Sequence, residues 1–217
     1  MSVLDPKKMR VKLDEVDPKT REAYNLRAFA FAEDYESQTP ERLHELMRSF
    51  FLPGGLCLDV GCGSGRDVAW LSSLGFAASG LDASENLLLE AVSLHPGLDF
   101  YLGALPDLDA VGETRFDNVL CSGVLMHLPE GDIVGACASL LRVLKNSGTL
   151  VLSFRASRNP HDSREEDGRL YTALEPTRLI SLFESLGAKL VRHEESLDGR
   201  QLRWQTLVLR KSKDEAE

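Results

Sequence analysis

The sequence predicts an α/β fold built on a mainly parallel sheet of seven strands, with helices on both faces. Beyond residue 53, short apolar runs alternate with helical patterns, which is typical of βαβ units and their parallel strands. A glycine-rich loop follows the first apolar run directly. The last two runs are separated only by residues 196–200, which leaves no room for a helical crossover, so these two strands must form an antiparallel hairpin.

Size and composition predict one globular domain. The chain has 217 residues, of which 43% are hydrophobic and 27% are charged. Its formal net charge of -9 disfavours nucleic acid and anionic lipid as partners, because both are bound through clustered Lys and Arg. No apolar run is long enough for a signal peptide or a membrane span, so a cytoplasmic protein without membrane attachment is expected.

The cysteines indicate free thiols in a reducing compartment. Their spacing fits neither a metal knuckle nor a disulfide framework, so no metal site is expected. They are Cys57, Cys62, Cys121 and Cys137.

The first fifty residues predict a loose arm, residues 1–20, and a helical cap, residues 21–52. The cap begins with an amphipathic helix from Thr20 onward, whose buried face carries Tyr24, Ala28, Phe31 and Tyr35. A second helix is expected to start with Thr39 as its cap and Pro40 as its first residue, and to end before Pro53.

Residues 53–211 are expected to form the core. The predicted strands are Leu56–Val60, Ala77–Asp82, Leu98–Leu102, Phe116–Cys121, Thr149–Phe154, Lys189–His193 and Arg203–Leu209. Two helices are clearest: one carries Ile133, Cys137, Leu140, Leu141 and Leu144 on a single stripe, and the other runs from Pro176 to Leu186. In open sheets of this kind, ligands bind at the carboxyl ends of the strands.

The glycine loop reads DVGCGSGR over residues 59–66 and opens a helix. It departs from the dinucleotide fingerprint G-x-G-x-x-G, because Arg66 stands where the third glycine is required. Asp59 would also face a bound pyrophosphate, and like charges about 4 Å apart at an effective dielectric of about 20 repel by about 4 kcal/mol. An ammonium group suits the same carboxylate. The loop therefore favours S-adenosylmethionine over NAD.

A second carboxylate, Asp82, ends the next predicted strand 21 positions after Gly61. The spacing suits the vicinal hydroxyls of a ribose, which donate two hydrogen bonds to one carboxylate. An alternative is that Asp82 caps the following helix, for which Ser84 is the better candidate.

Four segments in this order resemble the class I S-adenosylmethionine-dependent methyltransferases: LDVGCGSG, GLDAS, RFDNVLCSGVLMHL and LLRVLKNSGTLVLSF. The resemblance covers about residue 54 to the last strand. It implies a Rossmann-like sheet of seven strands with an antiparallel last strand, S-adenosylmethionine as cofactor, and methyl transfer to a small-molecule acceptor. Within the family, the chain is similar to compact small-molecule and tellurite-resistance-like members.

The resemblance also implies a set of cofactor-binding positions. These are Asp59, Gly61, Cys62, Gly63, Gly65, Asp82, Ala83, Ala104, Leu105, Cys121 and Ser122. Asp59 is expected near the methionine ammonium group. Gly103 stands where many members of the family have an acidic residue that contacts adenine. Two alternatives are expected in its place: backbone groups of Ala104 and Leu105 contact adenine, or Asp107 substitutes for the acidic residue.

Catalysis and acceptor binding are less well defined by the sequence. His127 is the histidine that a motif places at the expected face, where it could take a proton from the acceptor. A packed imidazole is the alternative. The polar segment from Arg155 to Leu174 has the length of a lid. The expected acceptor-binding residues are Tyr24, Arg27, Arg155, Arg169 and Tyr171.

Two other functions stay open at this point. An NAD-linked oxidoreductase is disfavoured by Asp59 and Arg66 but would share the strand and loop pattern. A non-catalytic relative that binds S-adenosylmethionine would share every motif.

Overall fold

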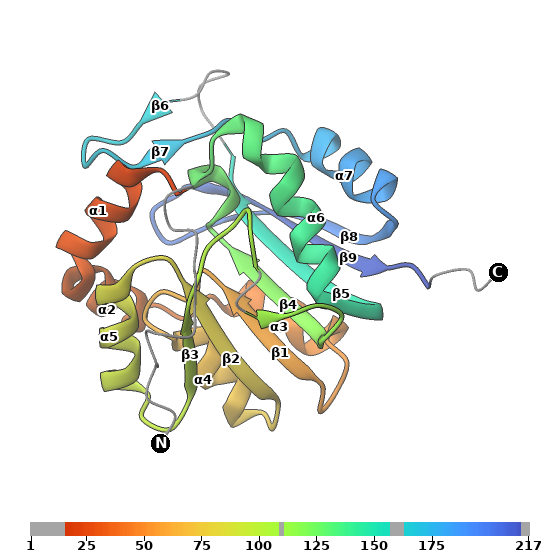
Figure 1. Cartoon of the computed structure of the whole chain (residues 1–217), viewed down its shortest axis with the longest axis horizontal. Coiled ribbons are helices and arrows are strands. Elements are labelled where there is room, and N and C mark those ends of the chain that lie inside the picture. The colour runs from red at the N-terminus through yellow and green to blue at the C-terminus, as the bar shows by residue number, and fades with distance from the viewer. Residues whose placement is uncertain (1–15, 109–110, 157–162, 214–217) are drawn as a thin grey trace.

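The computed structural model describes residues 16–108, 111–156 and 163–213 (Figure 1). They contain a seven-stranded sheet in the order β3-β2-β1-β4-β5-β9-β8. The strands are β1 (Leu56–Val60), β2 (Ala77–Asp82), β3 (Asp99–Leu102), β4 (Phe116–Ser122), β5 (Leu144–Arg155), β8 (Ala188–Leu197) and β9 (Arg203–Lys211). The pairs from β3 to β5 are parallel, while β9 pairs antiparallel with both β5 and β8. The Rossmann-like fold and its antiparallel last strand are confirmed.

Two strands are longer than the apolar runs predicted. β5 begins at Leu144 rather than Thr149, because Leu144 already pairs with Phe116 ahead of a register shift. β8 continues to Leu197, which pairs with Arg203 across the hairpin. Its exposed face carries polar side chains, so hydrophobic patterning alone could not reveal the extension.

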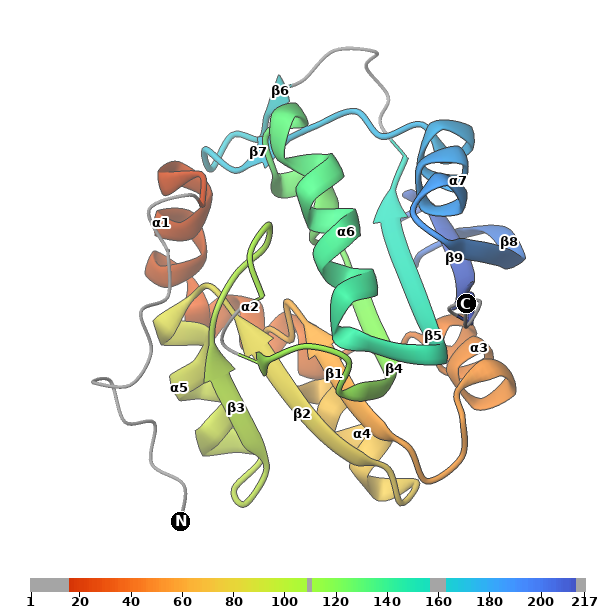
Figure 2. The ribbon, with the colours of Figure 1, turned by 45° about the vertical axis from the view of Figure 1, so that its right-hand side comes forward.

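The helices cover both faces of the sheet, as the sequence predicted. They are α3 (Glu41–Phe50), α4 (Arg66–Ser73), α5 (Glu85–Leu94), α6 (Ile133–Val143) and α7 (Pro176–Ser185). In Figure 2, α6 crosses in front of the strands while α4 lies behind them. Successive residues of a strand alternate accordingly: Leu120 joins the cluster formed with α3 and α4, whereas Val119 and Cys121 join the cluster formed with α6 and α7.

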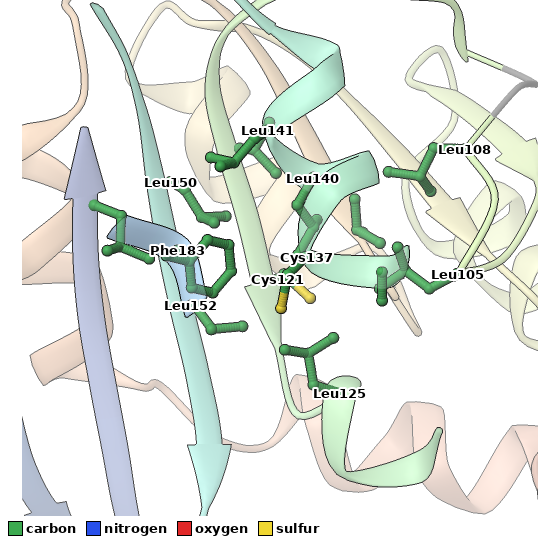
Figure 3. Packing of buried hydrophobic residues seen from close by; sticks show 14 of the residues in the cluster. Leu105, Leu108, Cys121, Leu125, Cys137, Leu140, Leu141, Leu150, Leu152 and Phe183 are labelled. Carbon is green, nitrogen blue, oxygen red and sulfur yellow. The ribbon is translucent and has the colours of Figure 1, made fainter. Parts of the chain in front are cut away.

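The largest core cluster lies between the central strands and helices α6 and α7. Figure 3 shows Phe183 from α7 and Leu140 from α6 packed against Leu150 and Leu152 of β5. All four side chains are fully buried. Burial of this kind contributes about 1.5–3 kcal/mol for each large apolar side chain, which fixes the strand ends in relation to one another.

The cap differs from the single helix predicted from Thr20 onward. The chain instead forms α1 (Pro18–Leu26) and α2 (Ala28–Glu36), separated at Arg27, whose φ of -116° and ψ of 20° leave the helical region. Asp17 caps α1 through the backbone N–H of Thr20. The helix therefore begins inside the segment predicted as an arm, and residues 1–15 lie outside the described residues. The break lets α1 and α2 follow different parts of the cleft.

The start of α3 is also corrected. Pro40 is its N-cap rather than its first residue, and no side chain caps the helix, so Thr39 does not have the predicted role. The N–H of Glu41 instead bonds to the carbonyl of Thr39.

The predicted lid segment contains a short hairpin, β6 (Ser163–Arg164) and β7 (Leu170–Tyr171). This hairpin lies beside α1 in Figures 1 and 2. The guanidinium of Arg164 donates to both carboxylate oxygens of Asp17 at 2.9 and 2.7 Å, and the N–H of Leu170 donates to the hydroxyl of Thr20 at 2.8 Å. The Arg164 contact holds the pKa of Asp17 well below its usual value. Cap and hairpin therefore form one joined wall.

Among the helices of the described ranges, none combines the length and the apolar character needed to cross a membrane.

Candidate cofactor and acceptor site

A cavity of about 620 Å³ lies at the carboxyl ends of the parallel strands, beneath the cap helices. Its wall is formed by the glycine loop after β1, the ends of β2, β4 and β5, helices α1 and α2, and the turn between β8 and β9. This is the edge of the sheet where the sequence placed the ligand. The volume is within the range of small-molecule sites.

The glycine loop requires glycine at positions 61 and 65, because each has a positive φ and a Cβ there would collide with a neighbouring side chain. Gly61 has a φ of +77°, and a Cβ there would lie 2.2 Å from Cγ2 of Val124, so a side chain would be both strained and obstructed. At Gly65, φ is +84° and a Cβ would lie 2.6 Å from the ring of Phe100. Gly61 and Gly63 line the cavity, whereas Gly65 does not. The third glycine therefore serves the packing of the loop against β3.

Asp82 is held at the end of β2 by backbone donors. Its carboxylate accepts the N–H of Gly63 at 2.9 Å and that of Ser84 at 2.8 Å. Burial raises the pKa of Asp82, and these hydrogen bonds act in the opposite direction. Each carboxylate oxygen accepts a single bond from these donors, which leaves acceptor capacity toward the cavity. Ala83 lines the same wall, and Ser84 is the cap of α5, as expected.

Asp59 lies at the end of β1 and is only 3% exposed. Burial raises its pKa well above the usual value, and the negative charge of Asp67 raises it further, whereas Arg66 opposes the shift. A cation in the cavity would favour the ionised form of Asp59 and so oppose the effect of burial on its pKa. The site is therefore electrostatically suited to an ammonium group.

Arg66 and Asp67 fix the glycine loop to the cap. Arg66 donates to Asp67 at 2.7 Å and to the backbone carbonyl of Tyr35 at 3.0 Å. Asp67 also contacts Nε2 of His44 at 2.7 Å, and the His44 ring stacks on Trp70 with 3.8 Å between centroids. These contacts connect α2, α3 and α4 directly behind Asp59.

The residues predicted to border adenine lie together at one part of the cavity wall. Ala104 and Leu105 are buried and line the cavity. A Cβ at Gly103 would lie 2.6 Å from Cδ1 of Leu81, so this chain has no space there for an acidic side chain. Ser122 and Cys62 also line the cavity. Cys121 does not, because its side chain packs in the core beside Cys137 (Figure 3).

His127 reaches the cavity but both of its ring nitrogens are engaged. Nδ1 lies 2.7 Å from the carbonyl oxygen of Leu170, and Nε2 lies 3.0 Å from the hydroxyl of Tyr24. Burial lowers the pKa of His127 to about 4, with Arg169 and Arg155 adding to the shift. The imidazole is therefore neutral at physiological pH.

The expected acceptor-binding residues divide into two groups. Tyr24, Arg155 and Arg169 line the cavity. Arg27 points outward, pairs with Asp167 at 3.2 Å and is not among the lining residues. Tyr171 is buried behind the wall, where its hydroxyl donates to the carbonyl of Arg155 at 2.6 Å and accepts from the guanidinium of the same residue.

The sequence analysis assigned no binding role to several residues that line the cavity. Phe31 was predicted only on the buried face of the cap helix. Tyr35, expected with Tyr24 on the helix beside the acceptor, also lines the cavity, and its ring would be 3.1 Å from a Cβ at Gly63. Met126 and Trp204 lie beside Gly123, at 3.9 and 3.6 Å from a Cβ built there. Trp204 lies on the last strand, β9. The hydrophobic pattern of that strand does not distinguish it from an aromatic residue that only packs in the core, so the neighbouring sequence could not identify it as a cavity residue.

The site and the sheet together define an α/β protein with a ligand-sized cavity at the carboxyl ends of its parallel strands. Residues 57–148 match the family described as methyltransferase domain. The ubiquinone biosynthesis O-methyltransferase of Xanthomonas campestris pv. campestris (strain B100) is 35% identical over 119 residues, which cover 52% of this chain and 48% of that protein. The chain spans about half the length of the curated relatives it matches.

Solved structures share the fold over nearly the whole chain. A Burkholderia thailandensis 1,6-didemethyltoxoflavin-N1-methyltransferase, with bound 1,6-didemethyltoxoflavin and S-adenosylhomocysteine, has a TM-score of 0.74 at 20% identity and covers 90% of this chain and 88% of its own. The [4+2]-cyclase SpnF has a TM-score of 0.70 at 18% identity, with 91% and 97% covered. Residues 57–148 are thus similar to a methyltransferase domain, and the fold around them is shared with a methyltransferase whose structure contains S-adenosylhomocysteine. The tellurite-resistance-like placement stays a prediction.

Proposed function

We propose that the protein transfers the methyl group of S-adenosylmethionine to a small-molecule acceptor. The observation that carries the proposal is the pair of acidic strand ends on either side of the glycine loop, Asp59, which is buried, and Asp82, which is half-buried. A dinucleotide would bring a pyrophosphate against Asp59. The neighbouring SpnF structure is a cyclase, so fold alone does not decide the chemistry.

The lining residues suit the parts of S-adenosylmethionine in turn. Asp82 would accept the ribose hydroxyls, and the buried backbone of Ala104 and Leu105 would border adenine. Asp59 and the loop at Gly61 would receive the methionine end, where the ammonium group offsets the burial of the carboxylate. When bound, the sulfonium supplies an activated methyl group and a good leaving group.

The protein's contribution to such a reaction is mainly alignment. Displacement at the methyl carbon needs the nucleophile, carbon and sulfur in line, and well-oriented reactants can save about 7–11 kcal/mol of the barrier. The joined wall of α1 and the β6–β7 hairpin excludes water from one side, and the β8–β9 turn closes another. We infer that these walls hold the acceptor. An oxygen nucleophile is supported by the relatives, which are O-methyltransferases.

Isothermal titration calorimetry tests the cofactor assignment. The wild type is expected to bind S-adenosylmethionine and S-adenosylhomocysteine and to give no heat with NAD. Asp82→Ala removes the acceptor of the ribose hydroxyls and should weaken binding by about tenfold or more. Asp99→Ala is the matched control, since Asp99 is exposed at the start of β3 and should leave affinity unchanged.

Two outcomes would contradict the proposal. Binding of NAD in place of S-adenosylmethionine would support the oxidoreductase. Tight binding of S-adenosylmethionine without transfer of a labelled methyl group into any fraction of a small-molecule extract would support a non-catalytic relative.

A further inference from the structure

The contact between Tyr24 and His127 has a defined direction. A backbone carbonyl only accepts hydrogen bonds, so Nδ1 of His127 carries the proton that bonds Leu170 at 2.7 Å. Since the imidazole is neutral, Nε2 has a lone pair and must accept the hydroxyl hydrogen of Tyr24 at 3.0 Å. His127 therefore determines that the hydroxyl hydrogen of Tyr24 points toward Nε2 of the imidazole.

The other side of the Tyr24 hydroxyl faces two groups. Nη1 of Arg169 donates to its oxygen at 3.2 Å, and the Tyr35 hydroxyl lies close enough to interact with it. Burial raises the pKa of Tyr24 although Arg169 lowers it, so the phenol stays protonated at neutral pH. With its hydrogen directed to His127 and one lone pair accepting from Arg169, the oxygen of Tyr24 has one lone pair left, which can only accept a hydrogen bond from a ligand in the cavity.

The walls beside this oxygen are aromatic. Tyr24 and Phe31 have ring centroids 5.0 Å apart, and Phe31 stacks with Tyr35 at 5.9 Å and 22°. Trp204 lies against Gly123 across the cavity. The guanidinium of Arg169 lies over the rings of Tyr24 and Phe31 at 5.3 and 5.0 Å from their centroids, so a flat ring carrying a hydrogen-bond donor would contact the remaining edges of this aromatic cluster and bond to Tyr24.

We propose that Tyr24 binds the nucleophilic hydroxyl of a phenol-type acceptor as its hydrogen-bond acceptor, and that His127 is the positioning residue that orients Tyr24. This inference rests on the proposed function and names the acceptor class and the residue that touches the reacting oxygen. In this arrangement His127 does not contact the acceptor. The sequence motif singled out His127, whereas the residue that contacts the acceptor is Tyr24.

The proton has a complete route in this arrangement. As the oxygen–carbon bond forms and the carbon–sulfur bond breaks, sulfur keeps the bonding electron pair. The acceptor's proton passes to the oxygen of Tyr24, and the proton of Tyr24 passes to Nε2 of His127. The low pKa of His127 then releases this proton to water, which restores the neutral imidazole. The products are the methyl ether and S-adenosylhomocysteine.

Absorbance titration of 4-nitrophenol into the protein saturated with S-adenosylhomocysteine tests the inference without turnover. The bound probe should show the spectrum of the neutral phenol, at a pH where much of the free probe is ionised, because Tyr24 accepts its hydrogen. Tyr24→Phe keeps the ring and should weaken probe binding about tenfold. Tyr101→Phe, on β3 and outside this cavity, is the matched control and should have no effect.

Two variants of His127 separate positioning from direct contact. His127→Gln can place an amide oxygen near Nε2 and should retain probe affinity, whereas His127→Asn is too short to reach Tyr24 and should lose about as much as Tyr24→Phe. Nitrogen-15 NMR of His127 should also show the Nδ1–H tautomer in the wild type.

Several results would overturn the inference: a bound probe in its phenolate form, no probe binding, equal loss in His127→Gln and His127→Asn, or the Nε2–H tautomer. S-adenosylhomocysteine affinity is measured in every variant. Failure of that ligand to bind the wild type would instead contradict the proposed function, so the two failures are distinguishable.

Discussion

The two halves of the cavity are built in different ways. The cofactor half consists of strand ends and backbone: Asp59 belongs to β1, the glycine loop follows β1, and Asp82 ends β2, where its carboxylate accepts two main-chain N–H groups. The acceptor half consists of side chains from α1, α2, the β6–β7 hairpin and the β8–β9 turn, which are distant in the sequence. The first half has the stiffness of the sheet, whereas the second depends on contacts between separate elements.

The difference explains the comparisons with known proteins. The methyltransferase-domain match covers residues 57–148, which include the glycine loop, Asp82 and His127. Tyr24, Arg169 and Trp204 all lie outside it. The same fold also occurs in a [4+2]-cyclase, so the fold by itself does not determine the reaction.

The largest expected effect on stability comes from a substitution in the cofactor half. Gly61→Ala combines a positive φ with a Cβ that would lie 2.2 Å from Val124, and it should lower the free energy of unfolding by about 4 kcal/mol. Gly75→Ala is the control, because its φ is +87° but nothing lies within 4 Å, so only the backbone strain of about 1–2 kcal/mol remains. Urea denaturation measures both. Equal losses would show that the loop is not tightly packed.

An intermediate effect is expected from His127, where the two halves meet. Its pKa of about 4 in the folded protein lies below the ordinary value of 6.5, so the unfolded chain binds the extra proton between these pH values. The stability associated with neutral His127 is therefore fully present above about pH 6.5 and falls by about 3 kcal/mol as the pH drops toward 4.

Urea denaturation at several pH values checks this pH dependence. In His127→Gln the part of the slope between pH 6.5 and 4 that comes from this histidine should disappear. An unchanged slope would mean that His127 titrates normally in the folded protein.

The smallest effect is expected at the joint between cap and hairpin. Thr20→Val removes the acceptor of the Leu170 N–H and should cost about 1 kcal/mol of stability. This hydrogen bond joins α1 to the β6–β7 hairpin, and both elements form the wall on the acceptor side. Binding of the 4-nitrophenol probe should therefore weaken, while the affinity for S-adenosylhomocysteine stays constant. Calorimetry and absorbance titration measure the two affinities. A parallel loss of both would show that cap and cofactor half act as one unit.

The sequence by itself determined the sheet, its antiparallel last strand and the position of Asp59 and Asp82 at strand ends that line one cavity. These features follow from local rules: strand patterns, glycine at positive φ, and the spacing between consecutive strand ends. Even here, Gly65 packs against Phe100 and the Cys121 side chain lies in the core, since a motif does not state which of its residues face the cavity.

The tertiary structure decided the rest. It broke the cap helix at Arg27, directed Arg27 outward and buried Tyr171, and it brought Tyr24 to His127 across 103 positions and Trp204 to Gly123. Such contacts depend on how separate elements pack, and the same aromatic residues would show an identical periodicity in any helix or strand with a buried face. Only packing could place Tyr24 between His127 and the cavity.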